Sequence, residues 1–192
     1  MSTTTPDTPT ARAAAALAQE AAPAFLVNHS YRTYLFGAAV VTKDVDHEAG
    51  FVAAMIHDLG LTDAHRGDSD FGEVGAEVAA RFLEGRGWDR GRIRLVERAI
   101  LRHTKLIPEG SPTARVVQLG AQIDVAGRGM KKLDEQALTG ILRAYPRLDF
   151  ARQMRAVYLD EVQRQPKGSF AKLERTVHLS DRFERNPIDQ VV

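Results

Sequence analysis

The sequence contains no cysteine, and its charges almost cancel, with 26 Lys and Arg against 25 Asp and Glu. Without thiols, the chain cannot form disulfides, iron–sulfur clusters or cysteine-bound zinc sites. No apolar run reaches the roughly 18 residues that a transmembrane helix needs. The balanced charge gives no reason to expect nucleic acid or an anionic membrane as a partner. These absences leave a soluble globular protein as the default expectation.

The N-terminal residues 1–10 (MSTTTPDTPT) lack the basic segment and apolar stretch of a secretory signal. We therefore expect a cytoplasmic protein. We divide its 192 residues into a flexible or helical N-terminal extension (1–22), one domain (23–165) and a polar C-terminal extension that packs on that domain (166–192). A chain of this size buries about 70% of its unfolded surface, so the fold needs no disulfide or metal to form.

Apolar residues recur at helical spacing along most of the chain, and no alternation typical of strands is present. Asp46 is a good N-cap, and Gly60 is expected to be the C-cap of the same helix. The class predicted from this pattern is all-α, with loops over 61–72 and 104–111. The predicted helices cover residues 25–36, 46–59, 73–84, 90–103, 112–127, 134–143 and 150–162.

The adjacent residues His57 and Asp58 follow an apolar helical face in the segment AAMIHDLG. A neutral imidazole and a carboxylate are good ligands for a borderline divalent cation. The alternative is structural, because a histidine at a helix C-terminus interacts favourably with the helix dipole and an aspartate can pair with arginine.

Two further residues of the same kind lie among apolar neighbours, His29 in VNHSYRTYLFG and Asp124 in LGAQIDVAG. A buried carboxylate needs a cation partner, which can be an arginine or a metal ion. A single metal ion held by His29, His57, Asp58 and Asp124 would account for all four residues at once.

The order His29, His57-Asp58 and Asp124, with the doublet in HDLG, resembles the HD-domain superfamily. The similarity to its cyanamide hydratase-like branch runs from about residue 25 to 189. It is carried by NHSYRTYLFG, AAMIHDLGLTD, FGEVGAEVAARFL, AILRHT, AYPRLDF and ERNPIDQ, although Val74 stands where the branch has a glutamate. The resemblance implies a single helical HD domain whose metal site lies between central helices, with His29, His57, Asp58 and Asp124 as ligands.

Dinuclear HD enzymes have two additional histidines between the doublet and the last aspartate. His103 is one candidate, but 73–84 contains no histidine and His65 is a weak second candidate. We therefore expect one divalent transition metal, zinc ahead of iron, with manganese as a further alternative. His103 then becomes a donor facing the substrate, or else a C-terminal helix residue bonded to backbone carbonyls. Lys105 either orients the substrate or is an exposed loop residue.

The resemblance implies a hydratase or hydrolase that adds metal-activated water to a small molecule, such as cyanamide, which would yield urea. Asp58 would bind the metal and accept a proton from water, with His103 and Lys105 as the other catalytic candidates. One alternative is a phosphohydrolase of nucleotides or phosphomonoesters, and another is a non-catalytic binding protein with the same fold. A homo-oligomer is left open. The cations available for a phosphate clamp are Arg32, Arg66, Arg102 and Lys105.

Overall fold

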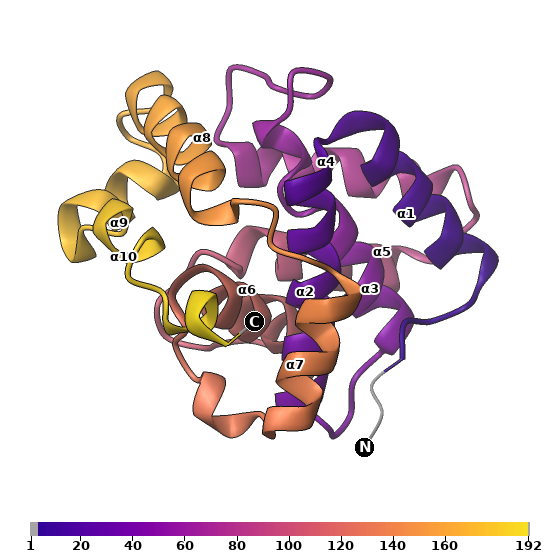
Figure 1. Ribbon diagram of the computed structural model, residues 1–192. Coiled ribbons are helices and arrows are strands. Elements are labelled where there is room, and N and C mark those ends of the chain that lie inside the picture. The colour runs from indigo at the N-terminus through magenta and orange to yellow at the C-terminus, as the bar shows by residue number, and fades with distance from the viewer. Residues whose placement is uncertain (1–3, 192) are drawn as a thin grey trace.

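The computed structural model describes residues 4–191, and this part of the chain contains ten α-helices and three short 3-10 helices but no strand (Figure 1). The predicted all-α class is confirmed. The α-helices are α1 (Pro9–Ala21), α2 (Ala24–Val40), α3 (His47–Ile56), α4 (Phe71–Glu84), α5 (Arg90–Arg102), α6 (Pro112–Ala126), α7 (Glu135–Ala144), α8 (Phe150–Arg164), α9 (Ser169–Val177) and α10 (Ser180–Phe183).

Among the helices of residues 4–191, α2 and α6 make the most extensive contact, and it is also close. Glycine makes this approach possible at two points. A Cβ atom on Gly37 would lie 1.8 Å from the carbonyl oxygen of Val116, and one on Gly120 would lie 1.7 Å from that of Thr33. Since His29 lies on α2 and Asp124 on α6, this packing also sets how near these two side chains lie.

We expect Gly120→Ala to lower the free energy of unfolding by at least about 2 kcal/mol, because the added methyl group would push two helix backbones apart. The melting temperature should fall by roughly 4–8 °C. Gly140→Ala is the matched control, since nothing lies within 4 Å of a Cβ atom at this position in α7. That variant should gain about 0.5–1 kcal/mol through helix propensity. Equal melting temperatures for the two variants would contradict the close α2–α6 contact.

Helix α3 is shorter than predicted, because it ends at Ile56 and a 3-10 turn, η1 (Leu59–Leu61), follows. The expectation that Gly60 caps this helix is therefore wrong. Gly60 instead lies against the start of α4, where a Cβ atom would come within 2.2 Å of the Phe71 carbonyl oxygen. The change of direction matters for the site, since Asp58 has left the helical conformation (φ −105°, ψ 7°) while His57 keeps it.

Helices α8, α9 and α10 form a separate layer near the C-terminus, and α9 and α10 were not predicted. Helix α8 packs against both α9 and α10, and Figure 1 shows the three together in orange and yellow, away from α1. Their apolar residues form a second buried cluster with residues from α2, η1 and α4. The segment is polar in composition, but Phe170 and Phe183 are buried and anchor it.

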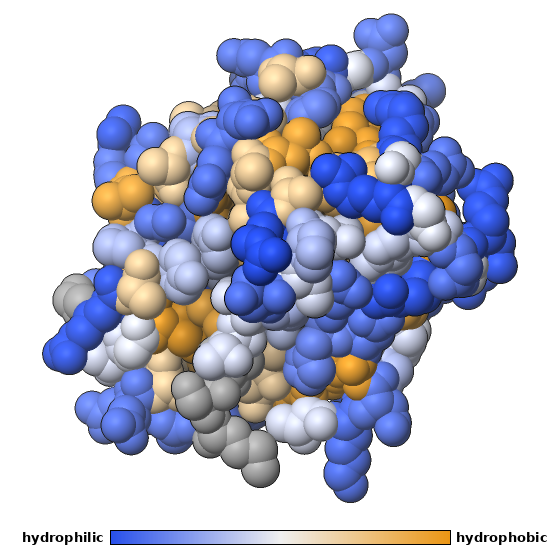
Figure 2. Space-filling view, turned by 90° about the vertical axis from the view of Figure 1, so that its right-hand side faces the viewer, coloured by the Kyte–Doolittle hydropathy of each residue, from blue (hydrophilic) through white to orange (hydrophobic). Residues whose placement is uncertain are grey.

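None of the helices in residues 4–191 is both long enough and apolar enough to cross a membrane. Figure 2 shows the face seen on the right of Figure 1, where hydrophilic side chains predominate and hydrophobic groups form separate patches. Among the described residues, the large hydrophobic side chains that are exposed are Leu101, Leu106, Ile107 and Leu148.

Candidate metal centre

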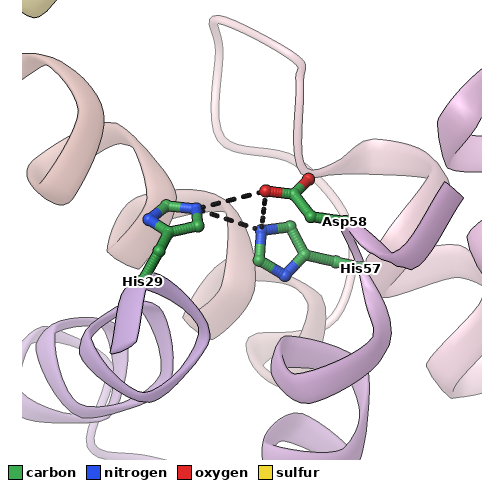
Figure 3. A group of neighbouring side chains, drawn as sticks. All are labelled: His29, His57 and Asp58. Atoms are coloured by element: carbon green, nitrogen blue, oxygen red, sulfur yellow. Dashed lines mark hydrogen bonds and ion pairs between the residues drawn. The ribbon is translucent and has the colours of Figure 1, made fainter. Parts of the chain in front are cut away.

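Three predicted site residues meet in the interior, His29 from α2 and His57 with Asp58 from the end of α3 (Figure 3). The Nε2 atom of His29 lies 3.3 Å from Nε2 of His57 and 3.4 Å from Oδ2 of Asp58. The Nε2 atom of His57 lies 3.2 Å from the same oxygen. All three side chains are buried. We call these residues the three-residue group.

The other nitrogen of each imidazole has its own partner. Nδ1 of His57 donates to the carbonyl oxygen of Ala54 at 2.7 Å, and Nδ1 of His29 lies 2.6 Å from Oδ2 of Asp124. With both protons on Nδ1, each Nε2 atom carries a lone pair that faces the other ring and the Asp58 carboxylate. Three electron-pair donors then converge with no proton between them, an arrangement that a cation stabilises.

The spacing of these donors fits a metal ion of the size of zinc. Bonds of about 2.0–2.1 Å in a tetrahedron place neighbouring ligand atoms about 3.3–3.4 Å apart. The three distances measured here are 3.2, 3.3 and 3.4 Å. Three protein ligands with one free position is the arrangement of catalytic zinc sites.

The electrostatics of the group also favour a positive charge. Burial alone would lower the pKa of His29, but hydrogen bonds to Asp124 and Asp58 raise it above its ordinary value. Burial alone would raise the pKa of Asp58, yet the adjacent His57 and His29 hold it well below its usual range. The carboxylate is therefore charged and ready to bind a cation at neutral pH.

Asp124 lies outside the three-residue group, on the opposite side of the His29 ring. Nε and Nη2 of Arg32 donate to its two carboxylate oxygens at 2.7 and 2.8 Å. Burial alone would raise the pKa of Asp124, but the Arg32 guanidinium and His29 hold it far below its ordinary value. The buried carboxylate thus has Arg32 as a cation partner in this structure, and its contact with Nδ1 orients His29.

Sequence reasoning missed the residues that support Asp124 from later in the chain. Nη1 of Arg147 donates to Oδ1 and to the backbone oxygen of Asp124, both at 2.9 Å. Nδ2 of Asn186 donates to the same backbone oxygen at 2.7 Å, and Arg147 also pairs with Asp189. The segments AYPRLDF and ERNPIDQ contain these residues. Both segments carried the family resemblance, but no residue in them was assigned a role.

His103 lies beside the group, at the end of α5. Its Nδ1 donates to the carbonyl oxygen of Ile100 at 2.5 Å, and its Nε2 lies 3.6 Å from Oδ1 of Asp58. Burial and the neighbouring His57 lower the pKa of His103 to about 4, so its Nε2 is a proton acceptor at neutral pH. The predicted role as a donor therefore requires that His103 first take up a proton. His65 lies outside the group.

A cavity of about 450 Å³ reaches the group, and His57, Asp58 and His103 line part of it. Lys105 also lines the cavity, but its side chain is exposed and lies in the loop after α5. Most of the remaining wall is apolar and comes from α6 and from α8, α9 and α10. The site therefore opens into an apolar chamber.

The arginines considered for a phosphate clamp are engaged elsewhere. Three of the four candidate cations pair with carboxylates that lie outside the cavity. The fourth candidate, Lys105, lines the cavity. Arg128 and Arg182 also line it, and all three of these side chains are exposed. The buried part of the chamber thus lacks the convergent cations that a phosphate group prefers. The three pairs are Arg32–Asp124, Arg66–Asp160 (2.9 Å) and Arg102–Glu109 (3.2 Å).

The described residues thus form an all-α protein with a buried histidine–aspartate group that could hold a metal ion. The family model described as HD domain matches residues 26–186. The chain therefore belongs to the HD domain family, whose members are metal-dependent hydrolases. The matched residues include α9 and α10.

Two curated relatives are similar over most of the chain. Cyanamide hydratase DDI2 and cyanamide hydratase DDI3 of Saccharomyces cerevisiae are each 25% identical to it over 193 residues. Each alignment covers 95% of this chain and 83% of the relative. The similarity is distant and extends over nearly the full length of the chain.

Proposed function

We propose that this protein is a metal-dependent hydratase that adds water to a small nitrile, with cyanamide converted to urea as the defining reaction. The observation that carries the proposal is the convergence of three donors from His29, His57 and Asp58 at the wall of a cavity. The names of the two yeast relatives support the choice of substrate.

We propose that His29, His57 and Asp58 hold one zinc ion and that Asp124 positions His29. When bound, the ion lowers the pKa of a coordinated water from about 15.7 to about 7 and polarises the substrate. Asp124 and the Ala54 carbonyl keep both Nε2 lone pairs directed at the ion, since each holds a proton on the opposite ring nitrogen.

His103 is suited to move the proton. Its Nε2 faces Asp58 Oδ1, so it is able to accept a proton from the attacking water and return it to the nitrile nitrogen. The oxygen of the water becomes the carbonyl oxygen of urea, and both of its protons end on the former nitrile nitrogen. Asp58 can share the first proton with His103 through Oδ1, because its other oxygen, Oδ2, faces His29 and His57. Lys105 at the cavity wall is the candidate for orienting the substrate.

The decisive experiment measures urea release from cyanamide by protein purified without an affinity tag and loaded with zinc. We expect turnover with zinc and none after chelation, with recovery on adding zinc back. A panel of nucleoside phosphates and phosphomonoesters is run beside it. Phosphate release without urea would transfer the assignment to a phosphohydrolase, and activity on neither class would remove the proposed reaction.

We expect His103→Ala to lower turnover by about 10²–10⁴-fold, the usual contribution of a general acid–base residue. The zinc content should stay that of the wild type, because His103 lies outside the three-residue group. Elemental analysis and turnover are measured on the same sample. His65→Ala, in the loop after η1, is the control and should retain both. A parallel loss of zinc in His103→Ala would make His103 a ligand instead.

A further inference from the structure

The cavity at the metal centre is far larger than the substrate that defines the proposed reaction. Cyanamide has three heavy atoms, and a single water occupies about 30 Å³ in the liquid, so cyanamide needs at most about 90 Å³. The cavity measures about 450 Å³. It has the size of sites that bind organic molecules of many heavy atoms.

The excess volume is bounded by fixed apolar side chains. Met154 of α8, Phe170 of α9 and Phe183 of α10 line the cavity and are buried in the second apolar cluster. Phe170 packs against Phe71 and Tyr158, with ring centroids 4.2 and 4.6 Å apart. These side chains are held by their own packing, so this part of the chamber keeps its shape and its apolar character.

The polar groups of the cavity are divided between two regions. The buried ones, His57, Asp58 and His103, all lie at the metal centre. The charged ones elsewhere on the wall are exposed, and Nη1 of Arg128 already donates to the Leu106 carbonyl oxygen at 2.7 Å. Two uncharged polar residues, Thr104 and Gln122, are half-buried on the wall, and Nε2 of Gln122 already donates to the Lys105 carbonyl oxygen at 2.8 Å. A ligand that fills the chamber therefore meets polar groups at its reacting end and apolar side chains beyond it.

We propose that the substrate carries an apolar substituent of up to roughly a dozen heavy atoms on its reacting nitrile group. This inference rests on the proposed hydratase function and names its substrate class, the monosubstituted cyanamides R–NH–C≡N with R alkyl or benzyl. Addition of water gives the substituted urea R–NH–CO–NH₂. The water oxygen becomes the carbonyl oxygen, both water protons end on the former nitrile nitrogen, and no oxidant or reductant takes part.

The first test compares kcat/KM for cyanamide, methylcyanamide, butylcyanamide and benzylcyanamide with the zinc-loaded protein. Each buried methylene should raise kcat/KM by up to about fourfold, so butylcyanamide should exceed cyanamide by at least about tenfold. A preference for cyanamide over butylcyanamide would overturn the inference, because the apolar wall would then contribute nothing to substrate binding.

The second test reduces the volume of the cavity by substituting a larger side chain on its wall. Val177, half-buried at the end of α9, lines the cavity, and Val177→Phe should lower the butylcyanamide-to-cyanamide ratio of kcat/KM at least about tenfold. Val125→Phe reduces the volume of the same cavity from α6 and should lower the ratio in the same way, so the test still stands if one of the two variants fails to fold. Val157→Phe is the matched control, since Val157 is half-buried on α8 but does not line the cavity, and its ratio should stay that of the wild type.

A binding measurement separates failure of this inference from failure of the proposed function. Calorimetry with butylurea and metal-free protein should show binding that Val177→Phe weakens and Val157→Phe does not. If no cyanamide is hydrated but this pattern holds, the proposed reaction fails and the apolar site stands. If butylurea does not bind the wild type, or binds Val177→Phe equally well, the inference is overturned whatever the activity.

Discussion

Asp58→Ala is expected to abolish turnover, with a loss of at least about 10³-fold, and to remove zinc from most of the chains. Asp58 supplies Oδ2 to the three-residue group and presents Oδ1 to His103, so one substitution removes a ligand and a proton-transfer partner. Wild-type protein should carry roughly one zinc per chain. Elemental analysis, turnover and far-UV circular dichroism on the same samples provide the measurement.

The fold of this variant should persist, because the apolar cores do not depend on Asp58. Asp63→Ala, an exposed position just beyond η1, is the matched control and should keep both metal and activity. Near-normal turnover in Asp58→Ala would exclude Asp58 from the mechanism. An equal loss in Asp63→Ala would show that the assay reports a general defect of the loop.

Arg32→Met is expected to lower the free energy of unfolding by about 3–5 kcal/mol, which would make it the largest stability effect of a single substitution at the site. Arg32 is fully buried and donates to both oxygens of Asp124. Its removal therefore leaves the negative charge of a buried carboxylate only partly neutralised. The melting temperature of metal-free protein should fall by roughly 6–20 °C.

Two further variants test the reason for this loss. Arg66→Met breaks a pair with Asp160 in which both side chains are substantially exposed, and it should cost less than about 1 kcal/mol. Arg32→Met combined with Asp124→Asn should recover part of the stability, because the uncompensated charge is gone. If Arg32→Met and Arg66→Met lose the same small amount, Asp124 does not depend on the buried pair.

The helices could be predicted well wherever one face of the helix is apolar and a capping residue marks its end. Helix α6 begins after Ser111 with Pro112 in its first turn and ends at Gly127 (φ 66°), as the sequence indicates. Helix α3 was harder, because its residues from Ala49 to Ile56 are all buried and apolar residues resume in η1. Periodicity cannot locate the end of a helix that has no polar face.

Three of the four candidate ligands named from the sequence lie together in the structure, and their arrangement was not predicted. His29, His57, Asp58 and Asp124 stood out because ligand-type residues lay among apolar ones, and that pattern is local in the sequence. Whether Asp124 joins the group or faces Arg32 depends on how α2 and α6 pack and on where the chain around Arg147 returns. Such pairings join residues about 90 and 20 positions apart, and no local pattern encodes them.

The sequence by itself determined the all-α class, the absence of thiol chemistry and the candidate metal ligands, because periodicity and side-chain chemistry are properties of short segments. Only the tertiary structure decided that three donors converge at 3.2–3.4 Å, that Asp124 pairs with arginine, and that α8–α10 close an apolar cavity over the site. The physical reason is that distance, burial and cavity volume arise from the packing of segments remote in sequence, which the close contact of α2 and α6 brings together.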